Sequence, residues 1–193
     1  MRRLKYLLSL LVLTSCGETF FFHRGKKPSN DQSYVYALPY PKGISHLLVQ
    51  GYHSGLSHKH VTGLDFAMKS GSTVTAARAG VVYQIAQSYN QGGLAERHSG
   101  KGNQIVIIHS DGSRAYYRHL YHQGAVVKVG DFVKVGQIIA RSGSTGYSAF
   151  PHLHFMVDKV DQRGVPVQMP TRFAQRNKAK YLRPGRWYKA HSN

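Results

Sequence analysis

The sequence predicts an all-β fold, a compact antiparallel sheet or sandwich built from short hairpins. From Tyr34 onward, short apolar or alternating runs are separated by Gly, Asp and Asn, the pattern of strands joined by turns. No stretch carries the long apolar stripe of a packed helix. With 41% hydrophobic residues over 193 positions, the chain can bury a real core in one domain of ordinary size.

Short runs of this kind, bounded by turn residues, are the candidate strands. They are residues 47–49, 63–68, 73–76, 80–86, 104–109, 114–119, 137–142 and 153–157. Just before the run at 137–142 comes a doubled turn, in which Val-Lys-Val-Gly-Asp at 127–131 recurs as Val-Lys-Val-Gly-Gln at 133–137. We expect a short hairpin repeat there, not a solenoid.

The first fifteen residues have the pattern of an export signal. Arg2, Arg3 and Lys5 make a basic start, residues 6–13 are apolar, and small residues precede Cys16. The apolar run is far shorter than the roughly 20 residues of a membrane-spanning helix. Leu-Thr-Ser-Cys also resembles a bacterial lipobox, which implies cleavage before Cys16 and lipidation of that residue. A plain secretory signal is the alternative.

These features divide the chain into three parts. Residues 1–15 are predicted to be a lipoprotein signal peptide, and residues 16–33 the lipidated Cys and a tether. Residues 34–193 then form one domain with a basic C-terminal tail, in which residues 171–193 combine basic and aromatic side chains without any acid. That tail predicts either contact with an anionic surface or a solvated basic face with its aromatic residues packed on the core.

The composition limits the partners and the kinds of site. The chain has 26 Lys plus Arg against 8 Asp plus Glu, a formal net charge of +18, which favours an anionic partner. Export argues against nucleic acid and favours anionic lipid and cell-wall polymer; we expect a monomer. A single Cys excludes a disulfide scaffold and any multi-thiolate metal site, whereas 12 His remain as potential ligands.

Two histidines alternate with apolar residues in Pro-His-Leu-His-Phe-Met-Val at 151–157. In a strand, His152 and His154 share one face and the apolar residues between them share the other. Neutral imidazoles placed in this way are zinc ligands or proton acceptors. A pair of surface histidines would show the same pattern, so a metal site needs a further ligand from elsewhere in the chain.

Asp65 is the candidate for that ligand. In residues 63–68, Leu64, Phe66 and Met68 point one way and Asp65 points the other, so the carboxylate can face the histidine pair across a sheet. Two His and one carboxylate complete a three-ligand catalytic zinc set.

A third segment, residues 114–120, places Tyr117 and His119 on one strand face by the same rule. His119 would steady an oxyanion or move a proton beside the metal without binding it.

In this order, the segments resemble the peptidoglycan-cleaving zinc metallopeptidases of the lysostaphin and LytM type, peptidase family M23. The resemblance covers about residues 34–188. It rests on Gly-Leu-Asp-Phe-Ala at 63–67, Tyr-Arg-His-Leu at 117–120, Gly-Asp-x-Val at 130–133 with Gly-Gln-Ile at 136–138, Ser-Gly-Ser-Thr-Gly at 142–146, and Pro-His-Leu-His-Phe at 151–155. It implies a duplicated hybrid motif fold, Zn²⁺ as cofactor, Asp65 and His154 as zinc ligands, and His119 with His152 as the unliganded catalytic pair.

The first zinc ligand departs from the usual His-x-Gly-x-Asp pattern, because the residue four before Asp65 is Val61. The chain is similar to a subgroup in which this ligand is the His of a Ser-His pair set farther from the Asp. The resemblance therefore implies His58 as the first ligand. His60 is a competitor, because a loop does not enforce the alternation of a strand.

The implied activity is zinc-dependent endopeptidase hydrolysis of amide bonds in peptidoglycan peptides or cross-links, with His152 accepting the proton of water and His119 stabilising the oxyanion. The alternative is a catalytically inactive LytM-like lipoprotein that activates other wall hydrolases, for which Val61 argues. A lipoyl-type carrier is disfavoured for two reasons: it needs one Lys alone at an exposed hairpin tip, and such carriers work in the cytoplasm. Gly17 after Cys16 predicts an outer-membrane lipoprotein facing the periplasm, and hence a D,D-endopeptidase.

Overall fold

The computed structural model describes residues 34–54 and 57–191, so the predicted signal peptide, Cys16 and the tether lie outside the described residues. The all-β prediction is confirmed: within the described ranges the elements are strands and one short 3₁₀ helix, η1 (Glu96–His98), with no α-helix. Among these residues, no helix has the length and apolar character that crossing a membrane requires.

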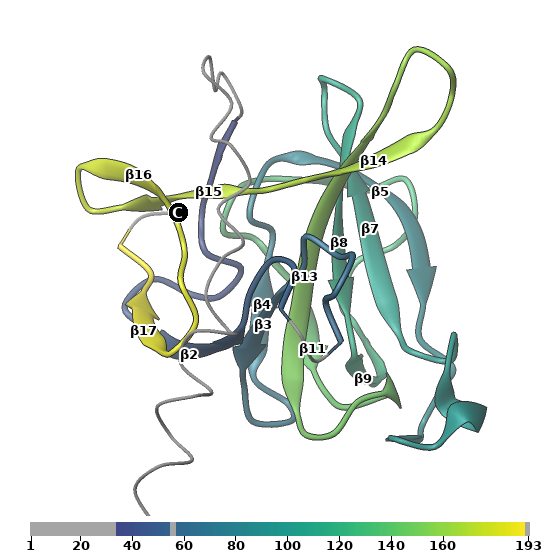
Figure 1. Cartoon of the computed structure of the whole chain (residues 1–193). Helices are drawn as coiled ribbons and strands as arrows, with labels where there is room; N and C mark the ends of the chain where they lie inside the picture. Colours follow the sequence, from purple (N-terminus) through teal and green to yellow (C-terminus); the bar gives the residue numbers. More distant parts are fainter. Residues whose placement is uncertain (1–33, 55–56, 192–193) are drawn as a thin grey trace, which may run out of the picture.

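A nine-stranded sheet forms the main layer of the molecule (Figure 1). Its strands run in the order β10-β5-β7-β8-β13-β3-β2-β17, and β14 pairs with β13 off this path. The bounds are β2 Ser45–Gln50, β3 Leu64–Ala67, β5 Gly80–Ala86, β7 Gln104–Ile108, β8 Ser113–Arg118, β10 Phe132–Val133, β13 His152–Val160, β14 Pro166–Met169 and β17 Arg186–Lys189. Every pairing in this sheet is antiparallel.

Three smaller sheets complete the fold. One has the order β1-β15-β16, another β4-β11-β9, and the third pairs β12 with β6. The bounds are β1 Val35–Tyr36, β4 Thr73–Thr75, β6 Gly92–Gly93, β9 Leu120–Ala125, β11 Ile138–Ser142, β12 Gly146–Tyr147, β15 Arg172–Gln175 and β16 Lys178–Tyr181. The pairs β1–β15 and β12–β6 are parallel.

Each predicted strand is present, and β5 has the predicted bounds. The additional strands lie where the sequence carries no alternation. β14, β16 and β17 are exposed along most of their length, so no buried face imposes a period of two on their residues. β9 begins only one residue after β8, at a sharp break that no composition signal marks.

The repeated sequence forms two turns with the same hydrogen bonds, but the expected hairpin repeat is wrong: β10, which lies between the turns, pairs with β5, and β11, which follows them, pairs with β4 and β9. In the first, the Asp131 N–H donates to the carbonyl of Lys128 while the Asp131 carboxylate accepts from the Lys128 N–H. In the second, Gln137 makes the same two bonds with Lys134. Each turn is therefore closed by one residue, Asp131 or Gln137, which bonds to the same Lys through both its backbone N–H and its side-chain oxygen.

The hydrophobic core lies against one face of β13, the long strand that crosses the middle of the main sheet (Figure 1). Leu153 and Phe155 are fully buried in it, together with Phe66 from β3 and Tyr117 from β8. The rings of Tyr117 and Phe155 meet edge to face with centroids 5.3 Å apart. Packing on this face leaves the opposite face of β13 to carry His152 and His154.

Candidate metal centre

The pairing of β13 with β3 brings one histidine and one carboxylate together. His154 and Asp65 are direct cross-strand partners, and the Nδ1 atom of His154 lies 2.9 Å from Oδ1 of Asp65. Leu64 and Phe66 on either side of Asp65 are fully buried in the core, so alternation turns the carboxylate to the other face. The antiparallel register of β13 and β3 therefore places Asp65 beside His154, as the sequence predicts.

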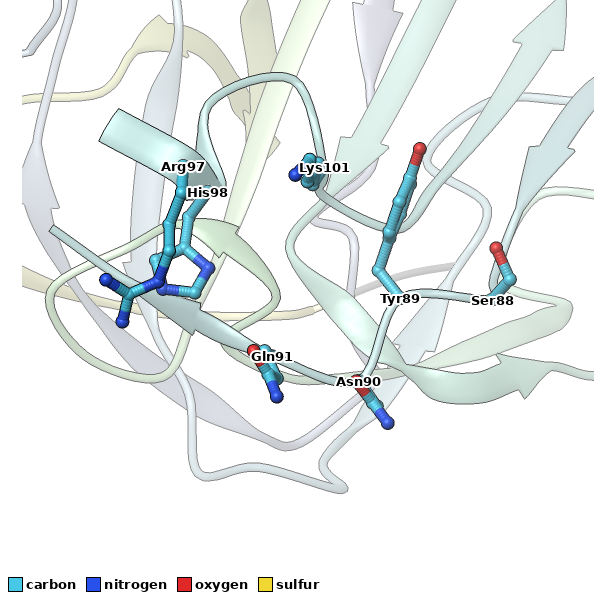
Figure 2. Close-up of a pocket in the computed structure, with 7 residues that line it drawn as sticks. All are labelled: Ser88, Tyr89, Asn90, Gln91, Arg97, His98 and Lys101. Atoms are coloured by element: carbon cyan, nitrogen blue, oxygen red, sulfur yellow. The ribbon is translucent and has the colours of Figure 1, made fainter. Parts of the chain in front are cut away.

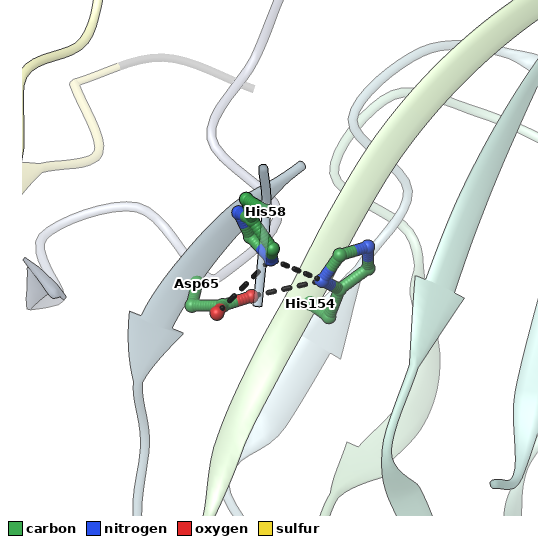
Figure 3. Close-up of side chains that lie close together, drawn as sticks. All are labelled: His58, Asp65 and His154. Carbon is green, nitrogen blue, oxygen red and sulfur yellow. Dashed lines mark hydrogen bonds and ion pairs between the residues drawn. The ribbon is translucent and has the colours of Figure 1, made fainter. Parts of the chain in front are cut away.

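His58 joins this pair from the loop between β2 and β3. Its Nε2 atom lies 3.1 Å from Nδ1 of His154 and 3.3 Å from Oδ2 of Asp65. Figure 3 shows the three side chains converging, and their donor atoms all lie within 4.8 Å of one another. His58 is 2% exposed, whereas His60 is exposed. Of the two candidates for the first ligand, the structure therefore brings only His58 to the cluster.

Backbone contacts orient His58. Its Nδ1 atom lies 3.0 Å from the carbonyl oxygen of Gly51, and since a carbonyl only accepts, Nδ1 carries the proton. Nε2 is then the ring nitrogen that faces the cluster: it donates to Asp65 when the ring is protonated and offers a lone pair to a metal when the ring is neutral. The buried amide of Gln50 holds the turn in place: with its oxygen toward the loop, it accepts from the N–H groups of Ser57 and His58 at 3.2 and 3.0 Å.

The protonation states of His58, Asp65 and His154 depend on one another, because the three side chains are in contact. Burial alone would raise the pKa of Asp65, but hydrogen bonds from His154 and His58 outweigh it and hold that pKa well below its usual range. Burial lowers the pKa of His58, while the hydrogen bond and negative charge of Asp65 raise it, and the net pKa lies above its ordinary value. Asp65 is therefore an ionised carboxylate that attracts positive charge to this site.

His119 and His152 lie beside the cluster with their ring centroids 4.6 Å apart. Nδ1 of His119 donates to the carbonyl of Thr145 at 2.8 Å, and Nδ1 of His152 donates to the carbonyl of Phe150 at 2.8 Å. Each neutral ring thus keeps a lone pair on Nε2. In His152 that atom lies 3.8 Å from Oδ1 of Asp65. Burial, then the neighbouring imidazoles, lower the pKa of His119 to about 3.

One expectation about this segment is wrong. Tyr117 and His119 do not share a face: Tyr117 is fully buried in the core and its hydroxyl accepts from the N–H of Ala77 at 2.8 Å. The backbone at His119 has a φ of 61°, in the left-handed region, and lies just past the end of β8. That conformation breaks the alternation and sends the imidazole to the site while Tyr117 stays in the core.

Sequence patterns also missed a buried residue that supports the site. Asn103 is fully buried, and its N–H donates to the Thr145 hydroxyl at 2.9 Å while its side-chain amide donates to the carbonyls of Leu120 and Tyr121. Asn103 therefore holds both Thr145, whose carbonyl accepts from His119, and residues 120–121, which directly follow His119. An isolated Asn before a strand carries no signal of such a role, because Asn is ordinary in turns.

Gly63 leaves the space that the two imidazoles fill. A Cβ atom at this position would lie 2.4 Å from Cε1 of His154 and 3.0 Å from Cε1 of His58. We expect Gly63→Ala to displace both rings and to weaken metal binding by about 10- to 100-fold, the range for disturbed ligand orientation. Isothermal titration with Zn²⁺ measures this. Gly164→Ala is the control, because its Cβ meets open space and its cost is confined to backbone strain at φ 81°. Equal zinc affinity in the two variants would contradict the prediction.

Comparison with known proteins adds to this geometry. The family model for Peptidase family M23 matches residues 59–168, more than half of the chain. Lysostaphin from Staphylococcus simulans is 45% identical over 118 residues, which cover 61% of this chain and 19% of that protein. Peptidoglycan DD-endopeptidase ShyC from Vibrio cholerae is 36% identical over 120 residues, covering 61% of this chain and 25% of that protein.

Among solved structures, Helicobacter pylori Csd3 is similar, with a TM-score of 0.50, 28% identity, and coverage of 78% of this chain and 35% of that one. The chain spans about a fifth to a quarter of the length of the two curated relatives.

Proposed function

Because the chain belongs to peptidase family M23, we propose that it is a zinc-dependent endopeptidase that hydrolyses amide bonds in peptidoglycan peptides or cross-links. The observation that carries this proposal is the buried convergence of His58, Asp65 and His154. Two imidazole nitrogens and one carboxylate, with two further histidines beside them, are the donor set of a catalytic zinc site.

The spacing of the donors fits that ion. Ligands held 2.0–2.2 Å from a tetrahedral zinc lie about 3.3–3.6 Å from one another. Here the three donor pairs are 2.9, 3.1 and 3.3 Å apart, so a shift of a few tenths of an ångström accommodates the ion. His58 also has the supporting bond typical of a zinc ligand, from its second ring nitrogen to the Gly51 carbonyl.

When bound, zinc supplies Lewis-acid chemistry: it polarises a carbonyl and makes water more acidic. The chain supplies the proton acceptor. Nε2 of His152 carries a lone pair, faces the cluster and is oriented by the Phe150 carbonyl, so it accepts a proton from water at the site. The role expected for His119, donation to the oxyanion, needs a proton on Nε2. Because Nδ1 donates to the Thr145 carbonyl, Nε2 carries a proton only on a charged ring, and a change of tautomer would supply it only by giving up the bond to Thr145.

A second candidate function is a catalytically inactive relative that activates other wall hydrolases. Val61 is the observation that favours it, because a valine stands where the usual pattern has a ligand. His58 lies beside Asp65 and His154 in place of the missing group, which supports the enzyme. Zinc bound without any cleavage of peptidoglycan would favour the activator.

We also propose a cellular location and partners for the enzyme. Lipidation of Cys16 would anchor the chain in the cell envelope, at the outer membrane facing the periplasm, as a monomer that acts on peptidoglycan and not on nucleic acid. At the C-terminal end, Trp187 is 69% exposed between the basic residues Arg186 and Lys189 of β17, whereas Tyr181 and Tyr188 pack against the core. This exposed aromatic and its cations support contact of the tail with an anionic surface.

Sedimentation with purified cell wall tests that contact. Binding is expected to weaken as salt rises, because exposed charges are screened, and to weaken further when Arg186 and Lys189 are replaced by Gln. Lys128→Gln with Lys134→Gln, on exposed turns elsewhere, is the charge-matched control. Binding that changes neither with salt nor with the substitutions in β17 would show that the tail does not contact the cell wall through its charges.

The bond that is cut is proposed to be the direct D-Ala cross-link to diaminopimelate. Likeness alone does not choose, since the names of similar proteins include both a DD-endopeptidase and a glycyl-glycine endopeptidase. We expect protein from residue 17 onward, with zinc, to convert cross-linked muropeptide dimers to monomers. Mass spectrometry of the digest measures this conversion. Cleavage of Gly-Gly substrates only would overturn the bond assignment.

A further inference from the structure

A small polar pocket lies beside the candidate metal centre and has no role in the mechanism above. It is formed by residues 88–91 together with Arg97, His98 and Lys101, and we call it the 88–101 pocket (Figure 2). Its volume of about 190 Å³ is below the range of about 300–1,000 Å³ typical of sites that enclose a whole small ligand. A pocket of this size suits one functional group of a larger substrate.

The charge of the 88–101 pocket is positive. Arg97 and Lys101 line it, and none of the described residues that line it is acidic. Across the described residues, ion pairs engage Arg78, Arg114 and Arg163, each with an aspartate, but neither of the two cations of this pocket. The guanidinium and the ammonium are therefore available to an anion from outside the chain.

His98 is the buried part of the pocket. It is 7% exposed, yet its ring nitrogens make no hydrogen bond with the described part of the chain, which uses only the backbone of this residue. The ring is held in place from behind, since a Cβ atom at Gly93 would lie 3.4 Å from its Cδ2. Neither ring nitrogen is among the fully enclosed, unpartnered polar atoms of the described residues, so the ring presents a polar edge to the pocket, where a ligand can bond to it. Figure 2 shows His98 next to Arg97 at one end of the pocket.

The pocket is tied to the metal centre by short connections. The side chain of Asn103 accepts from the Tyr89 N–H at 3.0 Å and donates to the Tyr89 carbonyl at 2.7 Å, while its own N–H bonds to Thr145. Thr145 in turn accepts from His119. Next to Lys101, Gly102 approaches the site so closely that a Cβ atom there would lie 3.7 Å from Nδ1 of His119.

We propose that the 88–101 pocket binds a free carboxylate of the peptide whose amide bond lies at the metal centre. This inference rests on the proposed function, because that function brings a peptide bearing carboxylates to the site. Arg97 can hold a carboxylate with two parallel bonds, Lys101 adds a point charge, and His98 offers a ring nitrogen that has no partner among the described residues. A neutral amide in the same place loses the charge-assisted bonds, so the pocket would select substrates with a free carboxylate.

Cleavage kinetics test the selection. The native chain is expected to cut a cross-linked dimer with free carboxylates about tenfold more efficiently, in kcat/KM, than one with the recognised carboxylate amidated. Arg97→Gln and Lys101→Gln should each lose about that factor on the free dimer and change little on the amidated one. Lys159→Gln, at the far end of β13, is the charge-matched control. Equal loss on both dimers in the pocket variants would overturn the proposal.

Binding to a product-like peptide separates this inference from the proposed activity. The probe is a peptidoglycan stem peptide with all carboxylates free, compared with matched peptides in which one carboxylate at a time is amidated. NMR titration of the native full chain is expected to shift the His98 ring signals with the free peptide, and one of the amidated peptides should lose this effect and thereby identify the carboxylate.

The outcomes are distinct. Shifts at His98 without any cleavage would uphold the pocket and count against the enzyme. Cleavage with no shift at His98, or with the same shifts for every amidated peptide, would overturn the pocket and leave the enzyme standing.

Discussion

Replacing His154 with alanine is expected to remove bound zinc and cell-wall cleavage together. His154 makes the two shortest contacts of the cluster, at 2.9 Å from Asp65 and 3.1 Å from His58. Without its Nδ1 atom, two ligands remain, and a structural or catalytic zinc needs at least three from the protein. Loss of the several kcal/mol that a metal contributes to the transition state corresponds to about a thousandfold or more in rate.

The measurements for this variant are zinc content per chain and digestion of purified peptidoglycan, with circular dichroism to show that the β fold is kept. His191→Ala, near the C-terminal end of the described chain, is the matched control and should keep both properties. A folded His154→Ala protein with full cleavage would show that the metal assignment is wrong.

His58→Ala and His60→Ala form the second decisive comparison. The two residues are close neighbours in one loop, but His58 is buried with its Nε2 atom 3.3 Å from Asp65, whereas His60 is exposed. We expect His58→Ala to lose zinc and activity on the scale of His154→Ala, and His60→Ala to retain both. Because the substitution is chemically the same, any difference reports the place of the ring and not the loss of a histidine.

The other results of this pair are equally informative. Loss of zinc in His60→Ala alone would move the first ligand to His60 and leave the rest of the site as described. Zinc retained in both single variants would contradict the three-ligand site itself.

The half of the site that lies on strands was predictable from the sequence. Alternation alone places Asp65 opposite the core residues of β3, and the same rule places His152 and His154 opposite Leu153 and Phe155. In a sheet with one face packed in the apolar core, a shift of one residue would turn Asp65 and the two histidines into that core, so the pattern strongly fixes which face each residue takes.

The half that lies on loops was not predictable in the same way. His58 reaches Asp65 through contacts of its loop with Gln50 and Gly51, and such contacts leave no periodic trace in the sequence. The side chain of His119 does not follow the alternation of β8, because its backbone adopts a left-handed conformation. Only the family resemblance pointed to His58, and it left His60 open.

The exposed strands and the 88–101 pocket escaped prediction for a related reason. A strand such as β16 has no buried face that would select alternating apolar residues. The pocket is assembled by two loop segments that meet through Asn103, a residue whose type is common in turns of every kind.

A crystal structure of the zinc-loaded protein, with anomalous diffraction data collected on both sides of the zinc absorption edge, would locate the ion. We expect one strong anomalous peak bound by Nε2 of His58, the carboxylate of Asp65 and Nδ1 of His154, at about 2.0–2.2 Å from each donor. His119 and His152 should flank the ion without binding it. A peak bound by His60, or no peak at this cluster in a folded, zinc-treated crystal, would contradict the account.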